Sequence, residues 1–390
     1  MSTEVRESIE TAIVEMASTH KERLSVIKGV WVALIAKQHL LMLGPGGTGK
    51  SFLVRDVNSR ILGSRLFETQ LDETSDPAQV MGPVDVQGIK QGSYRRNIEG
   101  FLPWADIGFL DEFFNANGPT RHSIMKALNE RLREEDGKSI PIPLWSTFMG
   151  TNKLDADSDQ AAVWDRIHHR YVISYVRERD NILEMARESV RRQVSTYQAP
   201  EKASIQLDAL KVAHDEALRL ERDIPTATLD TFLDIREELL HNGIEIGSRR
   251  IAEGLKAVCA NAWLNGHTEA TIGDLDILQH MWWVLQADIE TSQKLILGIT
   301  NPGEKAALEF LDELETYRAD LRAAEDGDLD DTKKRLIGME IYKNCNRVLK
   351  EADALEEKAA AAGAGTLRIK EMRGRTEALL GQVQANIFNL

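Results

Sequence analysis

Residues 40–51 read LLMLGPGGTGKS, and this stretch decides the fold. Its apolar start predicts a buried strand, and residues 44–51 complete the pattern G-x-x-x-x-G-K-S. In such a loop backbone N–H groups turn inward around phosphate oxygens, Lys50 can reach the β and γ phosphates, and Ser51 can place its hydroxyl on Mg²⁺. A chance glycine-rich turn is the alternative, but the order of strand, loop and helical continuation argues against it. We therefore predict that a nucleotide binds to Gly44, Pro45, Gly46, Gly47, Thr48, Gly49, Lys50, Ser51 and Phe52.

The composition of the 390-residue chain, with 42% hydrophobic and 28% charged residues, is typical of a folded protein with two or three domains. No apolar run approaches the roughly 20 residues needed to span a bilayer, and the acidic N-terminus is unlike a signal peptide. Cys259 and Cys345 lack C-x-x-C spacing, which predicts reduced thiols. We therefore expect a cytoplasmic protein without a membrane span. The formal charge of −14 argues against a nucleic-acid partner, because it repels phosphate backbones.

A second decisive stretch is ADIGFLDE, residues 105–112, which predicts a short apolar strand with two carboxylates at its C-terminal end. Ligands of α/β sheets gather at that end of the strands. Asp111 would hold Mg²⁺, and Glu112 would polarise the attacking water. An apolar run that ends in Asp-Glu is often only a strand that meets solvent. Because this one lies roughly 60 residues after a complete phosphate loop, we interpret it as the second half of one site.

Two further polar side chains lie near the ends of predicted strands. Residues 144–152 (LWSTFMGTN) read as a central strand that ends in Asn152, which could orient the hydrolytic water or contact the γ-phosphate. The alternative is an Asn that caps the next helix. Arg166 lies within residues 161–176 (AAVWDRIHHRYVISYV), which predict a helix start followed by a final strand. This arginine is either a solvated surface charge or a cation directed at the ATP of another subunit.

Residues 84–101 (VDVQGIKQGSYRRNIEGF) alternate apolar and polar side chains around a short turn, which predicts a β-hairpin. The hairpin is either a plain surface ribbon or an insert that carries Arg95 and Arg96 toward a ring axis or a partner. Other patterns predict two helices within residues 4–37 and one helix each at residues 77–81 and 120–132. Residues 133–142 predict one further hairpin.

The second half of the chain is almost wholly helical by its apolar spacing. Residues 179–298 read as a separate helical domain, in which Arg249 and Arg250 lie at a helix start. A basic pair there opposes the helix dipole, which favours contact with an anion. Two long amphipathic helices, broken near Gly327, and a third over residues 367–390 follow. They predict either a helical hairpin folded onto the body or a protruding coiled-coil arm.

In this order and spacing, GPGGTGKS, IGFLDE, MGTN, WDRIHHR and GSRR resemble the AAA+ ATPases, specifically the MoxR family, and most of all its RavA-like branch. The resemblance covers about residues 20 to 300. It implies an α/β fold, with a P-loop core made of a central parallel sheet with helices on both faces. It also implies an α-helical lid after this core, and the apolar spacing described above adds a C-terminal helical, coiled-coil-like segment. The predicted domains are residues 1–178, 179–300 and 301–390.

The resemblance also implies a role for each motif residue. Lys50 and Ser51 match the Walker A pair, Asp111 and Glu112 match the Walker B pair, and Asn152 matches sensor 1. Arg166 matches the arginine finger that reaches the γ-phosphate on a neighbouring subunit. Arg249 matches sensor 2, with Arg250 as the alternative. The implied catalytic residues are Lys50, Glu112, Asn152 and Arg166, and the implied magnesium ligands are Ser51 and Asp111.

The function implied by this resemblance is ATP hydrolysis, with ATP and Mg²⁺ as cofactors, at the subunit interfaces of a hexameric ring. The ring would remodel or activate a protein partner that carries a von Willebrand factor A (vWA) domain, in a chaperone-like way. A nucleic-acid motor is one alternative, supported by Arg95 and Arg96. A nucleotide-gated scaffold is another, and the presence of both Glu112 and Asn152 argues against it, because a site that only binds has no need of them.

Overall fold

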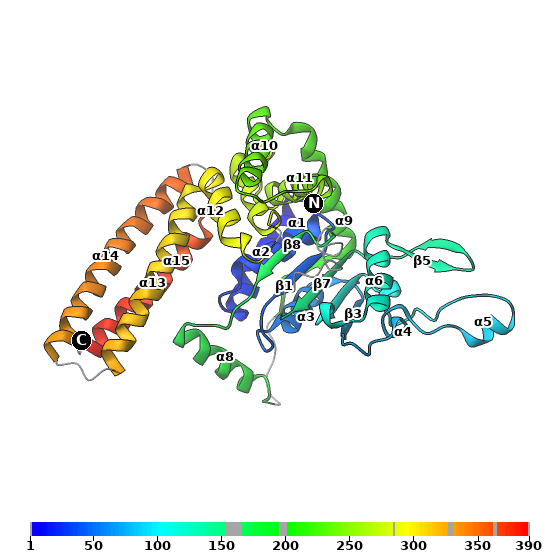
Figure 1. Ribbon diagram of the computed structural model, residues 1–390, viewed down its shortest axis with the longest axis horizontal. Helices are drawn as coiled ribbons and strands as arrows, with labels where there is room; N and C mark the ends of the chain where they lie inside the picture. The colour runs from blue at the N-terminus through cyan, green and yellow to red at the C-terminus, as the bar shows by residue number, and fades with distance from the viewer. Residues whose placement is uncertain are drawn as a thin grey trace.

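The computed structural model has three parts: a sheet flanked by helices, a helical lid, and a C-terminal helical bundle that extends away from both (Figure 1). The residues that it describes are 2–152, 166–194, 201–283, 285–326, 331–361 and 365–388. The predicted helix start at residues 161–165 and the predicted break near Gly327 lie outside the described residues.

A five-stranded sheet in the order β3-β4-β7-β1-β8 forms the centre of the first part, and all of its strand pairs are parallel. The apolar runs of the sequence become its buried strands, as expected when both faces of a parallel sheet are covered. The predicted central parallel sheet is therefore confirmed. Its strands are β3 (Leu66–Gln70), β4 (Ile107–Asp111), β7 (Ser146–Thr151), β1 (Leu40–Leu43) and β8 (His169–Val172).

Helices cover both faces of this sheet, as predicted. Leu40 and Met42 point into one apolar cluster, together with side chains of α1 (Ser2–Thr19), α2 (Leu24–Ile35), α3 (Lys50–Ser59) and α9 (Leu207–Arg219). Leu41, one residue along the same strand, points into a second cluster with α4 (Pro77–Met81) and α6 (Gly118–Glu130). Successive side chains of a strand point to opposite faces, so a four-residue strand joins both layers.

The predicted β-hairpin over residues 84–101 is wrong. Only one isolated antiparallel bridge forms, between Val84 and Arg96, and the tip of the segment is a short helix, α5 (Val86–Lys90). Asp85 caps this helix, because its carboxylate accepts a hydrogen bond of 2.9 Å from the backbone N–H of Gln87. In an exposed segment with little packing, such a local hydrogen bond outweighs a short apolar alternation.

The second predicted hairpin is confirmed as β5 (Leu132–Glu135) paired with β6 (Lys138–Pro141). Asp136 and Gly137 form its turn, with φ of 49° and 73°, as a two-residue hairpin loop requires. The turn contacts the loop that follows α5: Ser93 donates a hydrogen bond of 2.9 Å to the Asp136 carboxylate, and Arg95 forms an ion pair of 3.3 Å with it. Figure 1 shows both segments projecting from the same side of the core.

The lid follows the core, and the transition includes a small sheet in which β2 (Ile61–Leu62) pairs with β9 (Ile205–Gln206). Since β9 lies beyond residue 178 yet pairs with the core, the predicted limit between core and lid stays a prediction. Short 3-10 segments connect several elements: η1 (Leu102–Trp104), η2 (Phe113–Asn115), η3 (Leu220–Asp223) and η4 (Ile272–His280). The other helices are α8 (Arg179–Arg191), α10 (Thr226–His241), α11 (Ser248–Leu264) and α12 (Asp288–Thr300).

The C-terminal part is a three-helix bundle with an apolar core of its own, so it is more than a hairpin lying on the body. Its last helix ends in a π-helical turn, η5 (Gln384–Phe388). In the described part of the chain, no helix is long and apolar enough to cross a membrane. The bundle helices are α13 (Pro302–Asp326), α14 (Asp331–Ala361) and α15 (Leu367–Val383).

Candidate functional site

The phosphate loop leaves β1 at Gly44, where the sheet leaves no room for a side chain. The backbone N–H of Gly44 donates a hydrogen bond of 2.9 Å to the carbonyl of Thr151, and a Cβ on Gly44 would lie 2.0 Å from the Ile173 carbonyl oxygen. Gly47 and Gly49 adopt φ of 77° and 85°, a left-handed conformation that glycine adopts readily. A Cβ built on either would meet no heavy atom within 4 Å, so it is the backbone conformation, not crowding, that favours glycine at these positions.

Lys50 begins α3, directly after Gly49, which has no side chain to cap the helix. The first N–H groups of this helix are therefore suited to binding an anion. The Lys50 side chain is only 5% exposed, and its ammonium donates hydrogen bonds of 2.7 and 3.2 Å to the carbonyls of Gly44 and Pro45. The cation thus lies over the loop that would hold phosphate oxygens. Within the loop, the Thr48 hydroxyl donates a hydrogen bond of 2.9 Å to the carbonyl of Pro45.

Asp111 and Lys50 meet at the end of β7, which lies between β4 and β1. A Cβ built on Gly150 would lie 2.1 Å from the Asp111 carboxylate oxygen Oδ1 and 3.1 Å from Lys50 Cε. The missing side chain of Gly150 therefore creates the space in which the carboxylate and the lysine approach each other. Sequence reasoning treated Gly150 only as part of a motif, because its contacts come from the end of β4 and the start of α3, which are distant in the sequence.

Glu112 follows Asp111 in a left-handed conformation, with φ of 52°, which is uncommon for a residue with a side chain. Its backbone N–H donates a hydrogen bond of 3.1 Å to Asp111 Oδ1, and its carboxylate accepts one of 3.3 Å from the side-chain amide of Asn115. Strained backbone of this kind concentrates at functional sites. Sequence reasoning missed Asn115, although its position three residues after a candidate base is a usable signal.

Asn152 lies at the same edge of the sheet. It is exposed and directly follows Thr151, whose carbonyl accepts the hydrogen bond from Gly44. The structure therefore brings together the phosphate loop, Asp111, Glu112 and Asn152. Backbone donors, one ammonium and adjacent oxygen ligands fit a nucleotide phosphate with Mg²⁺, which prefers carboxylate, hydroxyl and phosphate oxygens. Ser51, half-buried in the first turn of α3, offers such a hydroxyl.

Arg166 lies at the other end of the sheet. It is half-buried and precedes β8, whose first residue pairs with Leu40 at the start of β1, whereas the phosphate loop follows the end of β1. Because β1 and β8 are parallel, the length of a four-residue strand, about 13 Å, separates the two ends. Arg166 is thus not grouped with the phosphate loop of its own chain.

Arg249 and Arg250 begin α11 in the lid, and the structure places them differently. Arg249 is exposed, whereas Arg250 is 6% exposed and donates a hydrogen bond of 3.1 Å to the carbonyl of Trp283. Arg170 donates to the same carbonyl at 2.7 Å. Neither Arg249 nor Arg250 is among the described residues that line the cavity next to the phosphate loop. The sensor 2 assignment therefore stays a prediction.

The residues that would support a nucleic-acid motor are engaged within the chain. Arg95 forms ion pairs with Glu135 and Asp136, at 3.5 and 3.3 Å, and Arg96 donates a hydrogen bond of 2.7 Å to the carbonyl of Gly82. The two carboxylates balance the charge of Arg95, which weakens the case for a phosphate-backbone contact there.

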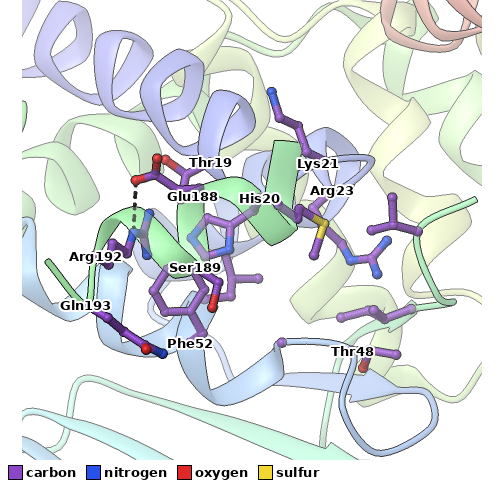
Figure 2. Close-up of a pocket in the computed structure, with 15 residues that line it drawn as sticks. Thr19, His20, Lys21, Arg23, Thr48, Phe52, Glu188, Ser189, Arg192 and Gln193 are labelled. Carbon is purple, nitrogen blue, oxygen red and sulfur yellow. Dashed lines mark hydrogen bonds and ion pairs between the residues drawn. The ribbon is translucent and has the colours of Figure 1, made fainter. Parts of the chain in front are cut away.

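A cavity of about 470 Å³ adjoins the phosphate loop at Thr48 and Gly49 (Figure 2). Phe52 lies in its wall, with its ring centroid 4.6 Å from that of His20, and the Arg192 guanidinium lies 4.9 Å from the same ring. Such a cavity is of the size that holds a small ligand. The described residues that line it are Thr19, His20, Lys21, Arg23, Thr48, Gly49, Phe52, Leu53, Ile173, Val176, Met185, Glu188, Ser189, Arg192 and Gln193.

His20 is held in this wall by Asp56, at 3.0 Å from Nε2 to Oδ2. Burial raises the pKa of the Asp56 carboxyl, but hydrogen bonds from His20 and Lys202 and the charge of Arg60 together hold it well below its usual range. Asp56 is therefore ionised and anchors the ring. Sequence reasoning found Phe52 but missed His20 and Arg192, which come from distant segments and carry no motif.

Comparison with known proteins adds a family assignment to this geometry. The family model for the MoxR domain of the MoxR-vWA-beta-propeller ternary systems matches residues 7–213, and an AAA lid domain matches residues 227–296. An uncharacterized protein of Methanocaldococcus jannaschii is 30% identical over 316 residues, which are 81% of this chain and 80% of that protein. A second one from the same organism is 28% identical over 342 residues, 87% of each chain.

Among solved structures, one from Cytophaga hutchinsonii, whose ATPase assignment is itself provisional, superposes with a TM-score of 0.62. It is 14% identical in sequence and covers 77% of this chain, while the match spans 96% of its own length. At this identity the likeness supports the fold alone, and it agrees with the core and lid described above. Assignment to the RavA-like branch stays a prediction.

Proposed function

This chain belongs to the MoxR family of AAA+ ATPases, and we propose that it binds ATP at the phosphate loop and hydrolyses it to ADP and phosphate. The observation that carries this proposal is the approach of Asp111 and Lys50 next to Gly150, beside the phosphate loop. A magnesium-binding carboxylate and a phosphate-binding lysine together hold a magnesium–nucleotide complex, and the adjacent Glu112 adds the base that hydrolysis needs.

Each residue of the candidate site then has a proposed role. Lys50 and the N–H groups at the start of α3 bind and orient the phosphates, and Ser51 and Asp111 would hold Mg²⁺, which supplies charge neutralisation. Glu112 accepts a proton from the attacking water, and Asn115 orients the Glu112 carboxylate by the hydrogen bond of 3.3 Å. Asn152, at the same edge, orients water or the terminal phosphate.

We place the site at a subunit interface of a ring, and the family resemblance makes six subunits the expected number. The support is the position of Arg166, which lies at the opposite end of the sheet from its own phosphate loop. From that position Arg166 would reach the nucleotide of the next subunit, where it would stabilise the charge that develops in the transition state.

For the use of the released energy, we propose chaperone-like remodelling or activation of a protein partner with a vWA domain. The support is the matched family model, which is defined by ternary systems that combine MoxR with vWA and beta-propeller proteins. Nucleotide-dependent motion of the lid against the core would transmit the change, as in other domain closures.

The test is phosphate release by the purified chain across a range of protein concentrations. Glu112→Gln is expected to lower turnover by about 10² to 10⁴ and to keep ATP binding. Arg166→Ala is expected to lower it by about 10³ to 10⁵. Exposed Glu99 and Arg335 offer the controls Glu99→Gln and Arg335→Ala, which should leave turnover unchanged. Full turnover by Glu112→Gln would overturn the catalytic proposal. Specific activity that does not depend on dilution, with Arg166→Ala unaffected, would overturn the ring.

A further inference from the structure

Helix α8 has an unusual position, because none of its residues is buried. Ile182, Leu183 and Val190 are 47%, 47% and 67% exposed, although an amphipathic helix ordinarily buries its apolar face. Apolar packing therefore contributes little to holding α8 in place, and its position depends on polar contacts.

The same helix forms one wall of the cavity next to the phosphate loop, as Figure 2 shows. Met185, Glu188, Ser189 and Arg192 line the cavity from this side. Arg192 is oriented by Glu188, at 3.1 Å, and lies over the ring of Phe52. Any shift of α8 changes the shape of a cavity that a nucleotide bound to the loop would enter.

Polar contacts hold the start of α8 on the core side. The Glu22 carboxylate accepts three hydrogen bonds of 3.0 Å, from the backbone N–H groups of Arg177 and Glu178 and from the side chain of Asn181. Arg177 and Glu178 directly precede α8, and Asn181 lies in its first turn, so this carboxylate fixes the segment that leads into the helix and carries a negative charge near the helix N-terminus.

The C-terminal bundle holds the same helix start from the other side. Glu178, the residue before α8, forms an ion pair with Arg318 of α13, and the two side chains are 12% and 10% exposed. Arg375 of α15 lies 4.0 Å from the same carboxylate and 3.5 Å from Glu315. Arg177 pairs with Glu315 at 3.2 Å. Removal of Arg318 would leave the Glu178 carboxylate with Arg375 at 4.0 Å, and the start of α8 would be held less tightly.

We propose that the C-terminal bundle positions α8, through the Arg318–Glu178 ion pair, and thereby sets the affinity of the cavity for nucleotide. This inference rests on the proposed function, because it assigns regulation to the same site. Arg318 is a positioning residue: it contacts the helix start, and the helix forms the cavity wall. A protein that binds and displaces the bundle would change nucleotide affinity without contacting the phosphate loop.

The experiment compares two bundle variants of the full chain. Arg318→Ala breaks the contact with α8, whereas Arg373→Ala breaks ion pairs with Asp353 and Glu356 that lie inside the bundle. Nucleotide affinity is measured with a fluorescent ATP analogue, and hydrogen exchange is measured for residues 179–191. Arg318→Lys keeps the charge and serves as the rescue variant.

We expect Arg318→Ala to weaken analogue binding by about ten- to hundredfold and to speed exchange in α8, since small displacements at a site have effects of that size. Arg373→Ala should change neither, and Arg318→Lys should recover part of the affinity. If Arg318→Ala binds like the unmodified chain, or if exchange in α8 does not change, the inference is overturned and the proposed function stands. If the unmodified chain binds no analogue, the proposed function fails, and the inference fails with it.

Discussion

The edge of the sheet that carries the phosphate loop and the wall formed by α8 face the same cavity, but they are built in different ways. At the sheet edge, backbone hydrogen bonds and close packing define positions: Gly44 is bonded to Thr151, and Lys50 is 5% exposed. In the wall, α8 has no buried residue and is held by side-chain ion pairs and the Glu22 cap. The residues proposed to act on the nucleotide therefore lie on the closely packed sheet edge, whereas the helix that encloses the cavity is held by contacts that can change.

The difference has a physical basis. Backbone hydrogen bonds in a buried sheet are exchanged only by opening the core, whereas partly exposed ion pairs can be broken and replaced by water at small cost. Catalysis needs reacting groups held in place, and binding and release of a ligand need an enclosure that moves. Variants in the two regions should therefore affect turnover and nucleotide affinity to different extents.

Among the variants that compare the two regions, Gly150→Ala at the sheet edge is expected to have the largest effect. The new Cβ would lie 2.1 Å from Asp111 Oδ1, so the carboxylate must move away from Lys50. We expect the rate of ATP hydrolysis to fall about 10²-fold or more. We also expect a loss of about 1 to 3 kcal/mol in the free energy of unfolding. Steady-state phosphate release and thermal melting measure the two.

Gly118→Ala is the matched control for this variant, because a Cβ there meets no heavy atom within 4 Å. Its hydrolysis and melting temperature should equal those of the unmodified chain. Normal turnover by Gly150→Ala would contradict the proposal that ATP hydrolysis requires the Asp111 carboxylate in its present position.

A smaller and pH-dependent effect is expected from Glu22→Gln, which weakens the cap of α8. Burial raises the pKa of Glu22, but hydrogen bonds from Asn181 and two backbone N–H groups outweigh it and lower the pKa below its usual 4.5. The ionised cap therefore stabilises α8 fully above about pH 4.5, and this contribution is lost as the pH falls through the lowered pKa. At pH 7 we expect hydrogen exchange of residues 179–191 to be about tenfold faster in the variant.

The ratio of the two exchange rates should approach one as the pH falls through the lowered pKa of Glu22, because the native carboxylate is then protonated as well. Glu184→Gln is the control: it removes an ion pair with Lys21 in which Glu184 is 59% exposed, and exposed pairs contribute little. A ratio that does not change with pH would show that the charge of Glu22 does not hold the helix.

The smallest effect is expected from Phe52→Ala, which removes the ring between His20 and Arg192. Ring contacts of this kind contribute about 0.5 to 1.5 kcal/mol, so the affinity for an ATP analogue should fall between about two- and tenfold, with turnover at saturation unchanged. Tyr94→Ala, at a side chain with similar exposure (47% against 41%), should leave the affinity as it is. A large fall in turnover would mean that the wall takes part in the chemistry.

Much of the fold could be predicted from the sequence, because the relevant signals are local. The apolar runs before Gly44 and before Asp111 became strands of one parallel sheet, on either side of β7, and the turn residues Asp136 and Gly137 formed the hairpin expected of them. The segment around α5 was predicted wrongly, because the cap supplied by Asp85 outweighed a short alternation of apolar side chains. Where packing is sparse, one side-chain hydrogen bond decides the local structure.

The sequence by itself determined which chemistry this protein can carry, since the glycines, the lysine and the paired carboxylates stand in two short motifs whose local conformation follows from their own residues. Only the tertiary structure decided where those motifs meet and what encloses them. Asp111 at the end of β4 and Lys50 at the start of α3 both lie next to Gly150 of β7, and Glu178 meets Arg318 over 140 positions of the chain. Such contacts depend on how whole elements pack, and no pattern within a single element encodes them.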